Sequence, residues 1–133
     1  MITGLNHITL AVSDLENSLC FYTELLDFKA HVAWESGAYL SAGPLWLCLS
    51  VDEVCSKDDY THFAFSVCEN DFIEFSKKIE GAGILKWKEN KSHGSSLYFL
   101  DPDGHKLELH AGDLESRLRS LKDKPYRKLK WLR

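Results

Sequence analysis

The chain has 133 residues, of which 44% are hydrophobic and 27% are charged, with eight glycines and three prolines. These proportions are typical of one compact globular domain, and they exclude a disordered tail and a collagen-like rod. The net charge of −4 is divided unevenly, because residues 113–133 carry +5 and residues 1–112 carry −9. An acidic body repels a phosphate backbone, so we interpret the basic segment as a solvated terminal helix and extension. We expect no nucleic-acid partner.

The cysteines and the first residues bear on the expected location of the protein. Cys20, Cys48, Cys55 and Cys68 show no CxxC spacing, which favours reduced thiols. The first residues lack the basic and apolar regions of a signal peptide, and no apolar run approaches the length of a membrane span. We therefore expect a cytoplasmic protein with no membrane partner.

An internal repeat organises the chain. Residues 6–12 (NHITLAV) and 61–67 (THFAFSV) align at an offset of 55, with histidine on histidine. Both segments alternate apolar with small or polar side chains, as half-buried strands do. A helix should follow each strand. The first should begin at Ser13, in a capping box completed by Glu16, and the second should begin near Asn70.

Three further strands should follow each helix. Their expected ranges are 28–34, 37–42 and 45–51 in the first half, and 84–89, 97–100 and 105–110 in the second. The tetrapeptide 101–104 (DPDG) has the chemistry of a turn, and the polar stretch 52–59 links the halves. The sequence thus predicts an α+β fold of two tandem βαβββ modules in a single domain. Module one spans about 1–57, module two about 58–112, and the basic extension about 113–133.

The polar faces of the predicted strands carry candidate metal ligands. His7 and His62 occupy equivalent places in the repeat, and Glu108 lies on a polar face between two core leucines. Two imidazoles and one carboxylate suit Mn²⁺ or Fe²⁺ with open coordination positions. Cys48 aligns with Glu108, but between leucines we interpret it as a small apolar core residue. The residues alone predict a metal-dependent enzyme and leave its reaction open. The histidines without a repeat partner are expected at the surface or behind the ligands: His31, His93, His105 and His110.

Five stretches carry a resemblance to a known family: 4–12 (GLNHITLAV), 37–40 (GAYL), 45–50 (LWLCLS), 59–62 (DYTH) and 98–108 (YFLDPDGHKLE). Over nearly its whole length the chain resembles the vicinal-oxygen-chelate (glyoxalase/bleomycin resistance) superfamily. Within it, the chain is similar to the fosfomycin-resistance glutathione transferases of the FosA type. The resemblance implies a transferase that holds Mn²⁺, or another divalent metal, on His7, His62 and Glu108. In such an enzyme the glutathione thiol attacks the epoxide carbon of fosfomycin next to phosphorus.

The resemblance also implies a homodimer and a set of binding residues. Paired modules of two chains would form a cup-shaped sheet, and each site would take His7 from one subunit and His62 with Glu108 from the other. Cations and hydroxyls suited to a dianion make up most of the substrate contacts, which fall on Thr9, Trp46, Lys88, Ser92, Ser96, Tyr98 and Arg117. Glutathione contacts fall on Ser36, Tyr39, Trp46 and Ser50. The implied catalytic residues are Thr9, which would bond the developing oxyanion, and Tyr39, which would assist the thiol.

K⁺ is a further expected activator by resemblance, at a loop that includes Asn90, Ser92, His93, Gly94 and Ser96. The family usually has a glutamate at the position of His93, and a neutral imidazole offers K⁺ no anionic oxygen. We therefore expect K⁺ stimulation to be weaker than in relatives that carry the glutamate.

Two alternatives remain open on the sequence. The first is another metalloenzyme on the same scaffold, such as an Fe²⁺ extradiol dioxygenase, a glyoxalase or an epimerase, because a fold does not fix a function. The cluster of Lys88, Ser96 and Arg117 argues against a catechol pocket, and Cys48 argues against an additional metal-directed carboxylate. The second is a drug-binding module without catalysis, against which the complete His7, His62 and Glu108 set argues.

Overall fold

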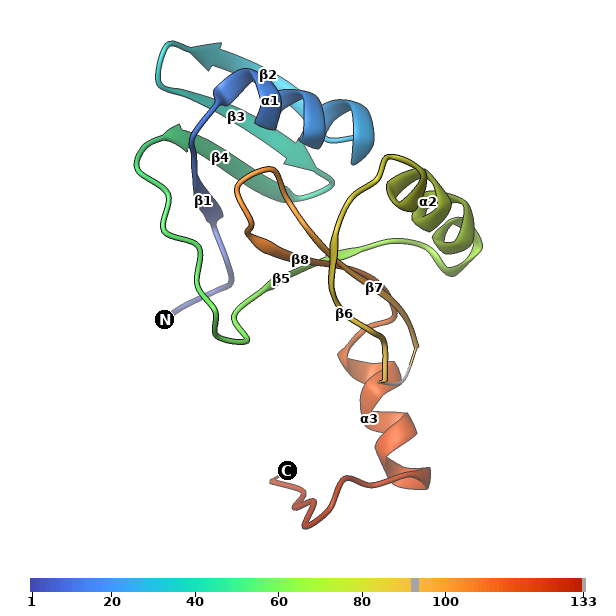
Figure 1. The fold of residues 1–133 in the computed structure, drawn as a ribbon. Coiled ribbons are helices and arrows are strands. Elements are labelled where there is room, and N and C mark those ends of the chain that lie inside the picture. Colours follow the sequence, from blue (N-terminus) through green and yellow to red (C-terminus); the bar gives the residue numbers. More distant parts are fainter. Residues whose placement is uncertain (92–93, 133) are drawn as a thin grey trace.

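A computed structural model describes residues 1–91 and 94–132 of the protein (Figure 1). The first half consists of β1 (His7–Val12), α1 (Leu15–Cys20), the π-helical turn η1 (Phe21–Leu25), β2 (Lys29–Trp34), β3 (Gly37–Ala42) and β4 (Leu45–Val51). The second half consists of β5 (Phe63–Ser66), α2 (Glu69–Gly81), β6 (Lys86–Lys88), β7 (Ser95–Leu100) and β8 (Lys106–Ala111). The last helix is α3 (Leu114–Asp123).

The two halves have the same topology. One four-stranded sheet has the order β1-β4-β3-β2 and the other has the order β5-β8-β7-β6. In each sheet the first and last strands of the half pair in parallel, and the other pairs are antiparallel. The predicted α+β class and the repeated βαβββ order are therefore confirmed.

The shared core lies on the helix-facing sides of the sheets. Alternate residues of the strands, such as Leu47 and Leu49 in β4 and Leu107 and Leu109 in β8, are buried. Rings from the first half contact rings from the second: the centroids of Phe28 and Phe65 are 5.3 Å apart. Because the core takes one face of each sheet, the opposite faces are free to carry polar side chains.

Polar contacts also join the halves. The buried Tyr22 hydroxyl donates to Asp101 Oδ2 at 2.8 Å, and the His105 ring nitrogen Nε2 lies 2.7 Å from the Ala11 carbonyl oxygen. The other oxygen of Asp101 accepts the backbone N–H groups of Asp103 and His105, both at 2.9 Å. The predicted turn at 101–104 is thus a folded loop whose carboxylate also binds the first half.

The predicted start of the first helix is wrong by one residue. Asp14, not Ser13, is the N-cap, and its carboxylate accepts the backbone N–H of Asn17 at 3.1 Å. The Ser13 hydroxyl instead donates to Asp103 Oδ1 at 2.5 Å, a partner 90 residues away. The second helix begins at Glu69 after Cys68, close to the predicted Asn70.

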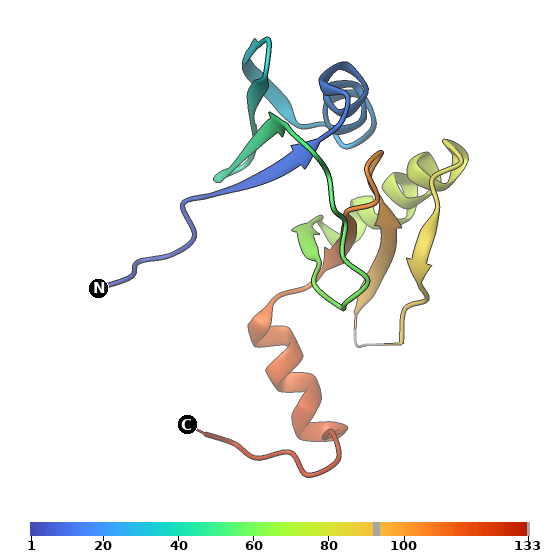
Figure 2. The ribbon, with the colours of Figure 1, turned by 60° about the vertical axis from the view of Figure 1, so that its left-hand side comes forward.

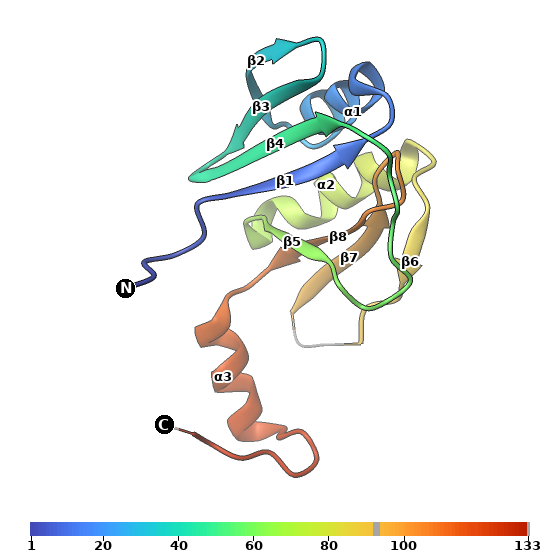
Figure 3. The same ribbon diagram turned by 90° about the vertical axis from the view of Figure 1, so that its left-hand side faces the viewer.

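The last helix and the C-terminal segment extend away from both sheets (Figures 2 and 3). Asp113 caps α3 in a reciprocal capping box with Ser116. Leu114 and Leu118 remain exposed on the helix. Among the described residues, no helix is long and apolar enough to cross a membrane.

Candidate metal centre and substrate site

The second half gathers His62 and Glu108 on the polar face of its sheet. Glu108 lies in β8, and its register partners are Ala64 in β5 and Tyr98 in β7. His62 precedes β5, and its Nε2 atom lies 3.0 Å from Glu108 Oε1. The Glu108 side chain is only 9% exposed, so its carboxylate depends on protein groups and on any bound cation for its interactions.

The hydrogen bonds of His62 provide a test of whether this pair suits a metal. Its Nδ1 atom lies 2.9 Å from the Tyr60 carbonyl oxygen, which can only accept, so Nδ1 carries a proton. Nε2 is then the ring nitrogen that faces the carboxylate, 3.0 Å from Oε1. A divalent cation in place of the proton that joins these two atoms would take one donor atom from each residue. An imidazole whose other nitrogen donates to a carbonyl is the usual arrangement of a metal ligand. The donor set therefore fits a divalent metal.

Lys88 and a group of aromatic rings surround this pair. The Lys88 ammonium lies 4.6 Å from the Tyr60 ring centroid and 4.8 Å from that of Tyr98, and it also donates to the Tyr60 hydroxyl. That hydrogen bond is the largest cause of a raised pKa for Lys88, and Tyr98 and then Glu108 make smaller contributions in the same direction. The site therefore holds a protonated amine close to the carboxylate.

Trp87 completes the aromatic group. Its indole N–H donates to the Leu107 carbonyl oxygen at 2.9 Å, and its ring centroid lies 5.3 Å from His62 and 5.1 Å from Tyr98. A register shift between Lys86 and Lys88 interrupts the pairing of β6 with β7. Such a bulge lets Trp87 and Lys88 both contact Tyr98. Sequence reasoning assigned no role to Trp87 or Tyr60; the available signal was their closeness in sequence to the predicted site residues Lys88 and His62.

Ser96 and His110 lie behind Glu108. The Ser96 hydroxyl is 2.7 Å from Glu108 Oε2 and 2.6 Å from His110 Nδ1. Arg117, in α3, lines a cavity of about 320 Å³ together with His110, Ser66 and Ala64. Four of the predicted substrate residues thus lie around the second sheet: Lys88, Ser96, Tyr98 and Arg117.

The first half presents a different face. His7 pairs in register with Trp46, and their ring centroids are 4.5 Å apart. Tyr39 lies 5.3 Å from Trp46 and 4.9 Å from Trp34, in edge-on contacts. These rings are more than one-third exposed. The predicted glutathione positions Ser36, Tyr39, Trp46 and Ser50 lie on or next to β3 and β4.

The repeat equivalence of Cys48 and Glu108 is visible in the register. Cys48 pairs with Thr9 in β1, and Glu108 pairs with Ala64, the repeat equivalent of Thr9, in β5. Cys48 is buried, as an apolar core residue would be. All four cysteines are free thiols, as predicted.

Within one chain the three predicted ligands do not meet. His62 and Glu108 are in contact, whereas His7 begins β1 in the other sheet (Figures 1 and 3). Among the described residues, no cluster of three or more histidine, cysteine, aspartate or glutamate side chains could hold a metal ion. A site built from all three predicted ligands would therefore need His7 from a second chain or a rearrangement within this one.

The predicted potassium loop is described in part. Asn90 donates through its side-chain amide to the Gly94 carbonyl oxygen at 2.9 Å, which closes the loop at its base. Ser96 follows in β7. Ser92 and His93 lie outside the described residues.

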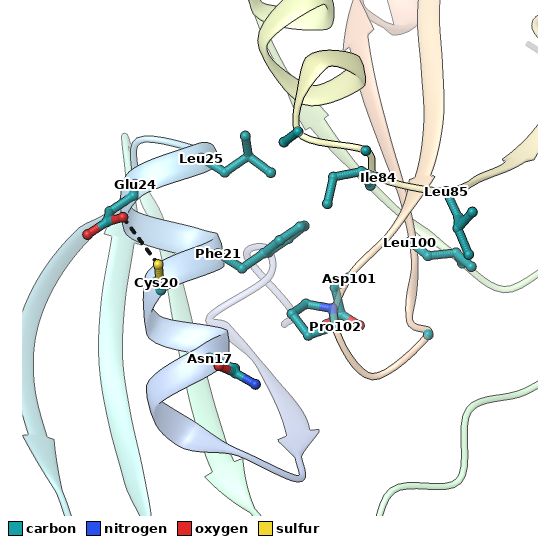
Figure 4. A pocket seen from close by; sticks show the side chains of 13 residues that line it. Asn17, Cys20, Phe21, Glu24, Leu25, Ile84, Leu85, Leu100, Asp101 and Pro102 are labelled. Carbon is teal, nitrogen blue, oxygen red and sulfur yellow. Dashed lines mark hydrogen bonds between the residues drawn. The ribbon is translucent and has the colours of Figure 1, made fainter.

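A larger cavity lies away from this chemistry, between the helical turn η1 and the loops 82–85 and 100–104 (Figure 4). Its volume is about 730 Å³, and its lining is mostly apolar, including Phe21, Leu25 and Ile84. At its edge the Cys20 thiol donates to Glu24 at 3.2 Å. Among the described residues, the lining includes none of the predicted site residues.

Comparison with known proteins gives the family. A family model described as the Glyoxalase/Bleomycin resistance protein/Dioxygenase superfamily matches residues 4–109. The chain belongs to this superfamily. Among its members, glutathione transferase FosA of Serratia marcescens is 54% identical over 131 residues, covering 95% of this chain and 93% of that protein. The metallothiol transferase FosB of Staphylococcus haemolyticus is 39% identical over 95% of this chain and 96% of its own length.

Solved structures of the superfamily agree with the fold. The fosfomycin resistance protein FosX of Listeria monocytogenes superposes with a TM-score of 0.81 at 32% identity, covering 90% of this chain and 99% of its own. A FosX mutant in complex with Mn(II) and 1S,2S-dihydroxypropylphosphonic acid superposes with a TM-score of 0.80 at 31% identity, covering 89% of this chain and 99% of its own. The resemblance of the sequence to fosfomycin-resistance proteins of this superfamily is confirmed.

Proposed function

We propose that the protein is a divalent-metal-dependent glutathione S-transferase that opens the epoxide of fosfomycin. The observation that carries the proposal is the close approach of His62 Nε2 and Glu108 Oε1, 3.0 Å apart, within a chain 54% identical to a glutathione transferase FosA. Mn²⁺ is the metal we propose, because it accompanies a phosphonate in a FosX complex. K⁺ and a cytoplasmic location remain parts of the proposal.

A homodimer supplies the missing donor. Module one of one chain, about residues 1–57, would pair with module two of the other, about 58–112, so that His7 of one subunit completes the set begun by His62 and Glu108. The exposed rings of Trp46 and Tyr39 beside His7 support this pairing, because aromatic side chains lose water favourably at an interface. A closed two-fold arrangement then forms two equal sites.

The chain provides donors suited to the phosphonate of fosfomycin. The protonated Lys88 amine would neutralise one phosphonate charge, and Arg117 would offer a planar pair of donors to the other. Tyr98, the register partner of Glu108, would donate its hydroxyl to a remaining oxygen, and Ser96, hydrogen-bonded to Glu108, would lie beside it. These contacts would fix the epoxide beside the ligand pair, where position alone removes much of the barrier.

The reacting groups would come from the first half. Thr9 would donate its hydroxyl to the epoxide oxygen as the C–O bond breaks and charge develops there. Tyr39 would donate its hydroxyl hydrogen to the glutathione sulfur and so favour the thiolate, which is the nucleophile. A bound divalent cation supplies Lewis-acid stabilisation of the same developing charge. Trp46 and the hydroxyls of Ser36 and Ser50 would line the glutathione side.

The test is product analysis on the purified protein. With Mn²⁺, glutathione and fosfomycin we expect a glutathione adduct by mass spectrometry. A parallel reaction with cysteine in place of glutathione tests for a cysteine adduct. A reaction without any thiol tests for the diol that addition of water would form. Glu108→Ala should lower adduct formation more than about 100-fold, beyond the effect typical of residues that only orient a ligand. Glu69→Ala, which removes another carboxylate that accepts a serine hydroxyl, is the matched control and should retain activity. No glutathione adduct, or equal adduct after Glu108→Ala, would overturn the assignment.

A further inference from the structure

We propose that His110 is a positioning residue that holds the Ser96 hydroxyl against Glu108 and thereby fixes which carboxylate oxygen faces the metal. The inference rests on the proposed role of Glu108 as a metal ligand. It concerns three side chains, from β7 and β8, on the polar face of the second sheet. Their contacts leave one consistent assignment of protons, derived from the donors and acceptors available to each group.

The Ser96 hydroxyl has one proton and two close neighbours. Its oxygen lies 2.7 Å from Glu108 Oε2 and 2.6 Å from His110 Nδ1. An ionised carboxylate only accepts, so the hydroxyl proton belongs to the bond with Glu108. At 2.6 Å His110 Nδ1 must then donate to the hydroxyl oxygen, because two lone pairs at that distance would repel each other. His110 Nδ1 therefore carries a proton, and the chain of donation runs from His110 to Ser96 to Glu108.

This chain divides the two oxygens of Glu108 between different tasks. Oε2 accepts from Ser96 and lies 3.3 Å from His110 Nδ1. Oε1 faces His62 Nε2 at 3.0 Å. Because the carboxylate is almost fully buried, water does not compete for Oε2 and the orientation is retained. Groups that orient a metal ligand in this way strengthen metal binding.

Two glycines lie at the far edge of the His110 ring, where a side chain would crowd it. A Cβ atom on Gly112 would lie 2.9 Å from His110 Nε2, and one on Gly94 would lie 3.2 Å from Cε1. Both glycines have positive φ angles, +144° and +87°, so side chains are disfavoured there on backbone grounds as well. The ring is thus confined between the segment leading into β7 and the segment leading into α3. The other groups that share its cavity include Ser66 and Arg117.

The tautomer is tested directly on the metal-free wild-type protein. Two-bond ¹⁵N–¹H correlation spectra, with His110 assigned through the His110→Asn variant, distinguish a ring protonated at Nδ1 from one protonated at Nε2. We expect the proton on Nδ1. A proton on Nε2 alone would overturn the proposed direction of donation, whatever the protein's activity.

The role in metal binding is tested by Mn²⁺ titration followed by electron paramagnetic resonance. His110→Phe keeps a ring between the glycines but removes the donor, and should weaken Mn²⁺ binding about 10–100-fold. His110→Asn returns an N–H near the position of Nδ1 and should recover much of the loss. His31→Phe is the matched control, because it breaks a histidine–serine contact of 2.7 Å remote from Glu108, and it should leave Mn²⁺ affinity unchanged.

A double-mutant cycle with Ser96→Ala tests whether His110 acts through the serine. The combined variant should lose less affinity than the product of the two single losses, because both remove the same chain of bonds. Losses of Mn²⁺ affinity that simply multiply in the double variant would contradict the inference. Equal losses of affinity in His110→Phe and His110→Asn would contradict it as well. If wild-type protein binds no Mn²⁺, the proposed function falls. If wild-type protein binds Mn²⁺ and His110→Phe binds it equally well, the inference alone falls.

Discussion

The two halves of the molecule share a topology and differ in what their sheets present. The second half surrounds Glu108 with hydrogen-bonded groups, including His62, Ser96 and His110, in a nearly buried setting. The first half places Cys48 at the equivalent register position and presents His7 among exposed aromatic rings. The repeat therefore keeps the scaffold and divides the chemistry: one half orients a charged site, and the other offers a histidine and an apolar surface. This division is the reason for proposing a site shared between two chains.

The largest expected effect of a single substitution outside the ligands is in the second half. Lys88→Ala removes an amine held between Tyr60 and Tyr98, and a hydrogen bond to a charged group contributes about 1.5–3 kcal/mol. We expect the KM for fosfomycin to rise by about 10–100-fold while the KM for glutathione stays near the wild-type value. Lys86→Ala, in the same strand but paired with Glu80 at 2.8 Å, is the control. An equal effect of the two substitutions would show that net charge, not position, matters.

The junction between the halves should affect stability and leave the chemistry intact. Tyr22→Phe leaves the buried Asp101 carboxylate without the hydroxyl that now donates to it at 2.8 Å. An unsatisfied buried acceptor costs about 1–3 kcal/mol, which urea unfolding would measure as a lower free energy of unfolding. Tyr126→Phe, in the exposed C-terminal segment, should change stability by less than about 0.5 kcal/mol. Unchanged stability in Tyr22→Phe would mean that this contact does not hold the halves together.

In the first half we expect a smaller effect, and one on glutathione instead of fosfomycin. Tyr39→Phe keeps the edge-on ring contacts with Trp34 and Trp46 but removes the hydroxyl. Loss of one hydrogen bond to the thiol should lower kcat/KM for glutathione by about 10-fold or less. Fosfomycin and Mn²⁺ binding should be unaffected, the reverse of the pattern for Lys88→Ala. If Tyr39→Phe instead weakened fosfomycin binding, the division of roles between the halves would be wrong.

The smallest effect concerns pH. The hydrogen bond to Tyr60 raises the pKa of Lys88, so the ammonium persists to higher pH than an ordinary lysine. The charged form is lost as pH rises through that pKa, and fosfomycin binding should weaken with it. Tyr60→Phe removes the largest cause, so its KM for fosfomycin should begin to rise at a lower alkaline pH than that of the wild type. Glu80→Gln is the control: it removes the main cause of the raised pKa of Lys86 instead. It should leave the pH dependence of the KM for fosfomycin unchanged.

Much of the architecture could be predicted because its signals are local or repeated. Alternation along the strands, the offset of 55 and the 101–104 turn were sufficient for the βαβββ order and for the alignment of Cys48 with Glu108. The start of α1 was wrong because the Ser13 hydroxyl is committed to Asp103, and no local pattern reveals a partner 90 residues away. The same limit concealed the bond between Tyr22 and Asp101.

Site residues could be predicted where the residue type restricts the possible chemistry. They could not be predicted where tertiary packing determines the position of the side chain. His62 and Glu108 were found from the repeat and lie in contact. Trp87 and Tyr60 were missed because a bulge in β6 and a loop before β5 determine where those rings lie. The sequence assigned no ligand role to His110 because it has no repeat partner. Its proposed role follows from the strand register, which places it opposite Ser96.

Subunit complementation is the most direct test of a site shared between two chains. His7→Ala and Glu108→Ala should each be inactive alone, because each removes a ligand from every site. When the two are co-expressed, half of the dimers are mixed, and each mixed dimer has one site with all ligands intact. Activity should then recover to about a quarter of the wild-type value per chain. No recovery in verified mixed dimers would contradict the account, because it would place His7 and Glu108 of one chain in the same site.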